Sequence, residues 1–191
     1  MKTFSTLTKA KSVRVLGVDP SSRHIAFAIV EKTGDHVSIL FSGKIELSSG
    51  DIFMKMQECF DNIQYLINEY GPEIFIVEQP ISIQNPQPTR ILTYIVGSLI
   101  VGAMQLLKNI YDVNPMVWKA HLGYKMVSAN EKKVWKIELG EKEARKKADF
   151  EKKERVKKIL RDRFNNFDDS DHDVCDAIGI ALYGADNYVR R

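Results

Sequence analysis

Residues 13–19, VRVLGVD, place a carboxylate at the end of a strongly apolar run. The run predicts a buried strand in which Gly17 permits close backbone approach, and Pro20 ends the strand directly after Asp19. An acid in such a setting is poorly hydrated and therefore needs a partner. This requirement constrains the fold more than any other feature, because the rest of the chain has to supply that partner.

Three further acids occupy comparable positions. Glu78 ends the apolar run IFIV, and Asp173 and Asp176 open the small-residue segment DHDVCDAIGIALYGA, which predicts a helix. Residues three apart lie on the same face of a helix, so the two aspartates point the same way. Four converging carboxylates favour a site for a divalent metal ion.

The chain has 191 residues, of which 44% are hydrophobic, and these values predict a single domain with its own core, residues 1–191. Cys59 and Cys175 lack CxxC spacing, which indicates core thiols rather than a zinc site. The longest apolar run, residues 94–107, is shorter than the ~20 residues of a membrane span. We expect a soluble protein of the cytoplasm, in a bacterial or phage-infected cell. Residues 1–12 predict a basic flexible N-terminus, and a mitochondrial signal there is the alternative.

Positive charge is concentrated in residues 124–164, which predict a basic helical segment. Residues 125–163 contain fifteen Lys or Arg and eight acids, whereas the rest of the chain contains thirteen and seventeen. Such a division is typical of a protein that binds a phosphate backbone and keeps its acids at a metal site. The alternative is a solvated helix supported by i,i+4 pairs such as Glu151 with Arg155. The candidate DNA-binding residues are Lys119, Lys125, Lys132, Lys133, Arg145, Lys146 and Lys147.

The order of elements follows from hydrophobic periodicity and from Gly and Pro punctuation. Three strands form an antiparallel meander, and a helical crossover then makes the fourth strand parallel to the first. The strands are expected at residues 13–19, 24–32, 37–47, 73–79 and 111–115. The helices are expected at residues 49–70, 89–109, 115–123, 128–164 with a weak point near Gly140, and 171–188.

Four pieces of sequence in this order resemble a known family. They are LGVDPSS at the first strand, IVEQP at the fourth, NPMVWK, and DVCDAIGIA in the last helix. With them the chain resembles the ribonuclease H-like superfamily and, within it, the RuvC-type Holliday junction resolvases. The resemblance implies an α/β fold with a mixed five-stranded sheet flanked by helices. Ser21, which replaces a Gly of many bacterial members, and the long basic segment favour a phage or organellar relative.

The resemblance implies that Asp19, Glu78, Asp173 and Asp176 are catalytic metal ligands. It implies two Mg²⁺ ions per site, with Mn²⁺ tolerated, and in-line hydrolysis of a phosphodiester. Simpler explanations exist for single residues, since Asp19 fits a turn and Asp173 fits a capping box begun by Ser170. Asp171 is an alternative ligand to Asp173. His172 is either an exposed loop residue or a catalytic support near the attacking water.

The resemblance also implies a homodimer that makes paired symmetric nicks in a four-way DNA junction. The candidate dimer face is the helix at 89–109, with core burial as the alternative; its apolar residues are Ile91, Ile95, Leu99 and Met104. Many bacterial members carry an aromatic residue shortly after the acid of the fourth strand, where this chain has Ile81 and Ile83. Trp118 is expected to pack in the core. The rival functions are a ribonuclease H-like nuclease acting on RNA/DNA hybrids, flaps or branched replication DNA, and a non-catalytic branched-DNA-binding protein.

Overall fold

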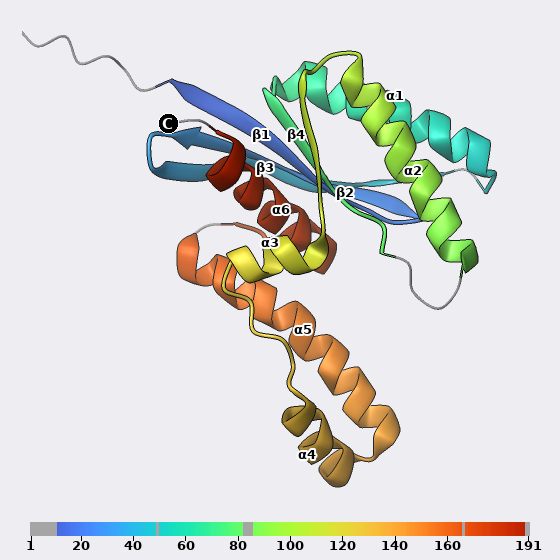
Figure 1. The fold of residues 1–191 in the computed structure, drawn as a ribbon, viewed down its shortest axis with the longest axis vertical. Helices are drawn as coiled ribbons and strands as arrows, with labels where there is room; N and C mark the ends of the chain where they lie inside the picture. Colours follow the sequence, from blue (N-terminus) through green and yellow to red (C-terminus); the bar gives the residue numbers. More distant parts are fainter. Residues whose placement is uncertain (1–10, 49, 82–85, 166, 190–191) are drawn as a thin grey trace, which may run out of the picture.

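The computed structural model describes residues 11–48, 50–81, 86–165 and 167–189, and it is an α/β fold built on one five-stranded sheet (Figure 1). The strand order is β3-β2-β1-β4-β5. The strands are β1 Ser12–Pro20, β2 His24–Thr33, β3 His36–Glu46, β4 Ile74–Glu78 and β5 Asn109–Val113. The helices are α1 Ile52–Tyr70, α2 Pro86–Met104, α3 Pro115–His121, α4 Ala129–Leu139, α5 Glu141–Arg163 and α6 His172–Tyr188.

The pairing of the strands confirms the predicted topology. β1 and β2 pair antiparallel, as do β2 and β3, whereas β4 pairs parallel to β1 and β5 parallel to β4. The β2–β3 register shifts beside Ile29, because Val30 pairs with Ile39 and Ile29 with Phe41. Leu40 is therefore an extra residue in β3, which is a β-bulge.

The two faces of the sheet carry separate cores, because successive strand residues point to opposite sides. Val15 and Ile76 face α6, whereas Leu16 and Phe75 face α1 and α2. Gly17 lies where the α6 backbone crosses β1, and a Cβ there would be 2.4 Å from the nitrogen of Ala181. α6 is thus held against the central strand by a contact that requires glycine, as the sequence predicted.

The basic segment differs from the single helix predicted for residues 128–164. It forms two helices, α4 and α5, that break at Gly140, whose φ of 78° lies in the left-handed region. Ser128 and Glu131 form a capping box that starts α4, while Ala144 and Ala148 of α5 are buried. α4 folds back along α5, and the pair projects from the sheet domain as an arm (Figure 1).

Other boundaries differ by a few residues. The first helix begins at Ile52 after its cap Asp51, not at Ser49, which lies outside the described residues together with residues 1–10. α2 ends at Met104 instead of residue 109, and β5 begins at Asn109. Within the described residues, no helix is both long and apolar enough to cross a bilayer. Both cysteines are buried free thiols, as predicted.

Asp186, near the end of α6, joins four elements through its carboxylate. It lies 3.2 Å from Nε2 of His121 and 3.5 Å from both Nζ of Lys32 and Nη2 of Arg163. Burial alone would raise the pKa of Asp186, but the hydrogen bond with His121 and the charges of Arg163 and Lys32 lower it overall. The carboxylate therefore anchors α6 to β2, α3 and α5 in its charged form.

The Asp186→Asn variant is expected to lose roughly 1–2 kcal/mol of stability at pH 7. A pKa that is lowered in the folded state contributes stability above the unfolded value, and this contribution is lost as pH falls through the folded pKa. The difference between wild type and variant should therefore shrink between pH 5 and pH 3. Urea denaturation across this range measures it. An equal difference at every pH would contradict the assignment.

Candidate active site

Asp19 and Glu78 lie side by side at one edge of the sheet. β1 and β4 run parallel, and the two acids directly follow the paired residues Val18 and Val77. Alternation along each strand directs both carboxylates to the α6 face. α6 begins at this edge and brings Asp173 and Asp176 in its first turns. The fold thus gathers the four acids that the sequence singled out.

Burial and the neighbouring acids together disfavour negative charge on Asp19, Glu78 and Asp176. Burial, followed by the charges of Glu78, Asp176 and Asp173, raises the pKa of Asp19 well above that of an ordinary carboxyl. Burial likewise raises the pKa of Glu78 and of Asp176, although Lys119 opposes both shifts. Repulsion of this kind is relieved by a bound cation.

Glu78, Asp173 and Asp176 each have a donor of their own. Nε1 of Trp118 donates to Oε2 of Glu78 at 2.7 Å, and Nζ of Lys119 donates to Oδ2 of Asp176 at 3.0 Å. Trp118 is fully buried, as predicted, and its ring lies against Gly179 of α6, where a Cβ would be 2.5 Å from it. α3 therefore supports the site through a tryptophan whose polar role the sequence did not reveal.

The donor set fits a divalent metal ion, because carboxylate oxygens are its preferred ligands and the cluster carries excess negative charge. As the side chains stand, no group of three or more His, Cys, Asp or Glu residues in the described part of the chain converges into a metal-holding geometry. One reason is visible in the contacts, since Glu78 and Asp176 are each drawn toward a separate donor. Ligation would require these two side chains to turn toward Asp19.

Asp171 serves a different purpose from the four acids. Its Oδ1 accepts hydrogen bonds from the backbone N–H groups of Asp173 and Val174, so it is the N-cap of α6. The alternative of a capping box that begins at Ser170 is therefore wrong, because the N-cap of α6 is Asp171, one residue later. His172 lies in the first turn with Nδ1 buried and without a hydrogen-bond partner among the described residues. Burial and the nearby Lys157 and Lys153 lower its pKa, and its catalytic role stays a prediction.

Two residues of the site were missed by the sequence analysis. His24 of β2 and Lys44 of β3 both contact the carboxylate of Asp173. Neither stands in a recognisable motif, and their position depends on the register of the meander.

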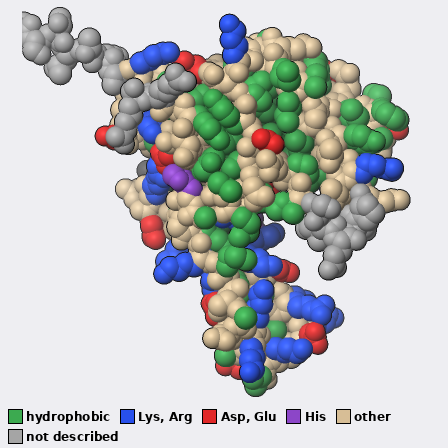
Figure 2. All heavy atoms as spheres, in the orientation of Figure 1, with side chains coloured by type: hydrophobic (Ala, Val, Ile, Leu, Met, Phe, Trp, Pro, Cys, Tyr) green, Lys and Arg blue, Asp and Glu red, His purple; other side chains and the backbone are tan. Residues whose placement is uncertain are grey.

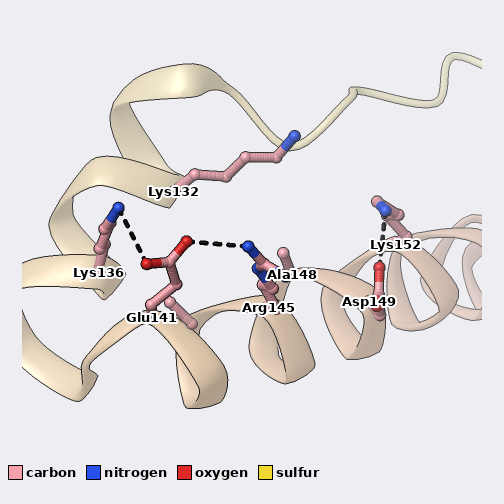
Figure 3. Close-up of a pocket in the computed structure, with 8 residues that line it drawn as sticks. Lys132, Lys136, Glu141, Arg145, Ala148, Asp149 and Lys152 are labelled. Atoms are coloured by element: carbon pink, nitrogen blue, oxygen red, sulfur yellow. Dashed lines mark hydrogen bonds and ion pairs between the residues drawn. The ribbon is translucent and has the colours of Figure 1, made fainter.

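The predicted DNA-binding cations divide between the site and the arm. Lys119 points at Asp176, whereas the others are spread along α4, α5 and the segment before them (Figure 2). A cavity of about 410 Å³ lies between α4 and α5, away from the four acids. Figure 3 shows Lys136 and Arg145 both directed at Glu141 within it. Part of the arm's positive charge is therefore paired internally, as expected for the alternative of a solvated Lys/Glu-rich helix.

The apolar surface of α2 differs from the face expected for a dimer. Ile95 and Leu99 are fully buried, so for these two residues core burial, and not a dimer contact, is correct. An apolar groove of about 460 Å³ instead runs between α1 and α2, and exposed hydrophobic side chains gather on this part of the surface (Figure 2). Its lining includes Phe53, Met56, Phe60, Tyr94 and Val101.

The sheet order and the acids at the ends of β1, β4 and the start of α6 define a ribonuclease H-like protein. The chain belongs to the family of the crossover junction endodeoxyribonuclease RuvC, whose family model matches residues 15–139. Asp173 and Asp176 lie beyond this match and are placed at the site by the fold.

Relatives and solved structures agree with this assignment. RuvC of Pseudoalteromonas atlantica is 32% identical over 89 residues, or 47% of this chain and 51% of that protein. RuvC of Aromatoleum aromaticum is 28% identical over 125 residues, or 65% and 66% of the two chains. The chain thus spans between half and two thirds of these relatives.

The structure of T. thermophilus RuvC in complex with Holliday junction substrate matches with a TM-score of 0.63 and 18% identity over 91% of this chain and 93% of that one. The fowlpox virus resolvase matches with a TM-score of 0.54 and 12% identity over 93% and 100%. Both likenesses show the fold.

Proposed function

We propose that the chain is an endodeoxyribonuclease that resolves four-way DNA junctions by paired symmetric nicks. The observation that carries this proposal is the gathering of four acids from β1, β4 and α6 at one sheet edge, with raised pKa values for Asp19, Glu78 and Asp176. Family membership and the junction substrate named for the T. thermophilus structure support the choice of DNA. A non-catalytic binder would have no need to hold these acids together.

Asp19, Glu78, Asp173 and Asp176 would hold the metal, and family membership supports a divalent ion. We propose two Mg²⁺ ions, which when bound would supply an activated water and stabilise the leaving oxygen of a phosphodiester. Trp118 orients Glu78 by its 2.7 Å hydrogen bond. Lys119, which lies 3.0 Å from Asp176, supplies a fixed positive charge beside the scissile phosphate. Mn²⁺ is expected to replace Mg²⁺.

Paired nicks on opposite strands require two sites, so we propose a homodimer. The groove between α1 and α2 supports it, because Phe53 and Val101, which line this groove, expose 73% and 53% of their surface. Sedimentation should show a dimer for the wild type and a monomer for the Val101→Glu variant. A wild-type monomer at micromolar concentration would contradict this arrangement.

The test of the proposed function is cleavage of a labelled four-way junction beside linear duplex, flap and RNA/DNA hybrid with Mg²⁺. Symmetric nicks in the junction alone would support resolution. Faster cleavage of hybrid or flap would favour the rival nuclease, and metal-independent binding without any nick would favour the branched-DNA binder.

Neutralising Lys132 and Lys133 is expected to weaken junction binding and flatten its salt dependence. Both side chains are exposed on α4, and no ion pair involves them within the described residues. The slope of log affinity against log salt should fall by about 0.9 for each phosphate that the variant no longer neutralises. Arg145 and Lys146 pair with Glu141 and Glu143, so replacing them should have a smaller effect.

Titration of fluorescent junction DNA at 50–200 mM salt measures these slopes. The Lys108→Gln variant is the matched control, because Lys108 is exposed, forms no ion pair within the described residues, and precedes β5 at the end of the sheet opposite Glu78. Equal slopes for the Lys132→Gln/Lys133→Gln protein and the wild type would rule out a phosphate contact by these lysines.

A further inference from the structure

One carboxylate oxygen of Asp173 is held from two neighbouring strands. Nε2 of His24 and Nζ of Lys44 each lie 3.0 Å from Oδ2 of Asp173. Nζ of Lys44 also lies 2.5 Å from Oδ2 of Asp171, the cap of α6. Among the described residues, no donor contacts Oδ1 of Asp173. The carboxylate is thus fixed on one side and open on the other.

The sheet register explains how Lys44 reaches this position. Asp19 pairs with Ala26, and Ala26 pairs with Lys44, so these three residues form one row across β1, β2 and β3. Residues in one row point to the same face of a sheet, here the face covered by α6. Two strand spacings place Lys44 about 10 Å from Asp19. Ala26 between them is too small to obstruct the first turn of α6.

One ammonium group serves two aspartates. Nζ of Lys44 contacts the carboxylates of both Asp171 and Asp173, which lie two residues apart. Only 21% of its side chain is exposed, so the pair is partly shielded from solvent.

We propose that Lys44 and His24 are positioning residues that bind Oδ2 of Asp173 and present Oδ1 to the metal site. This inference rests on the proposed function only in taking Asp173 as a metal ligand. Ligating carboxylates are commonly hydrogen-bonded by residues that do not touch the metal, and losing such a partner costs roughly 10–100-fold in metal affinity. A charge effect alone has the opposite sign, since removing a cation beside the site should tighten metal binding.

The test is Mn²⁺ binding to DNA-free protein, measured by the electron paramagnetic resonance signal of the free ion. Lys44→Met keeps the length of the side chain but removes its charge and its donors, and it is expected to weaken binding roughly 10–100-fold. Lys44→Arg should restore part of the affinity. The Lys32→Met variant is the control, because Lys32 also ties a strand to α6, through the carbonyl oxygen of Ala185, but at the far end of the helix.

Thermal melting of each variant separates positioning from simple anchoring. A Lys44→Met protein that melts earlier but binds Mn²⁺ as wild type does, or more tightly, would overturn the inference. So would a wild type that binds no Mn²⁺. Weakened binding in Lys44→Met, together with a wild type that nicks no junction, would uphold the positioning role and refute the proposed function instead.

Discussion

Replacing Asp19 with asparagine is expected to abolish junction cleavage, by roughly 10³-fold or more, while raising the melting temperature of the metal-free protein. Asp19 lies at the centre of the acidic cluster, since Glu78, Asp176 and Asp173 all raise its pKa in addition to burial. Asparagine keeps the size of the side chain but removes the ligand charge. Junction binding should persist, because the cations of the arm are unchanged.

The gain in stability has a definite pH dependence. A carboxyl whose pKa is raised in the folded state favours folding below its unfolded pKa of about 3.9, and this benefit is lost as pH rises through the folded pKa. The stabilisation by Asp19→Asn should therefore be larger at pH 8 than at pH 4. Melting curves with a chelator measure it, and Mg²⁺ should raise the melting temperature of wild type much more than that of the variant.

Asp112→Asn is the matched control for this experiment. Asp112 lies on β5 near the same sheet edge, where its carboxylate accepts a hydrogen bond from Gln79 rather than facing the other acids. The control should keep its cleavage rate and gain no stability. Cleavage by Asp19→Asn at the wild-type rate would show that the four acids are not the active site.

The Gly17→Ala variant is expected to show the largest loss of stability, about 3 kcal/mol. A Cβ at this position would lie 2.4 Å from the nitrogen and 2.7 Å from Cα of Ala181, and 2.6 Å from the carbonyl oxygen of Ala177. All three are backbone atoms of α6, which cannot move aside without shifting the whole helix. Since α6 carries Asp173 and Asp176, the shift should also lower cleavage, and a 1 Å displacement can cost roughly 10²-fold.

Urea denaturation gives the stability, and cleavage at a temperature where the variant stays folded gives the activity. Gly50→Ala is the control, because a Cβ at Gly50 would have no atom within 4 Å. A Gly17→Ala protein with wild-type stability and activity would show that α6 has room to withdraw from β1.

The sequence predicted the sheet and the four acids because both depend on local patterns. Apolar runs that end in an acid identify β1 and β4, and the parallel pairing follows from the helix between them. The sequence analysis predicted only a weak point at Gly140 in one long helix, whereas the chain forms two helices there. Charged residues continue on both sides of Gly140, so the sequence does not indicate that the chain reverses direction. The fold-back depends on tertiary contacts of Ala144 and Ala148, which leave no periodic signal.

Lys44 was missed for a different reason. Counting back from the β2–β3 turn, where Thr33 pairs with His36, places Gly43 opposite Ala26. The bulge at Leu40 moves the register by one residue, so Lys44 takes that position instead. No motif in β3 indicates the bulge.

The same bulge lets β3 lose one residue without loss of the cation beside the acidic cluster. Leu40 is the extra residue, so deleting it would restore the regular register and still leave Lys44 opposite Ala26, in the row of Asp19. Loss of the bulge at constant length would instead place Gly43 in that row and turn Lys44 toward the α1 and α2 side. A single in-frame deletion at position 40 is thus a change of length that relatives can accept in evolution with the lysine and the acids both kept in place.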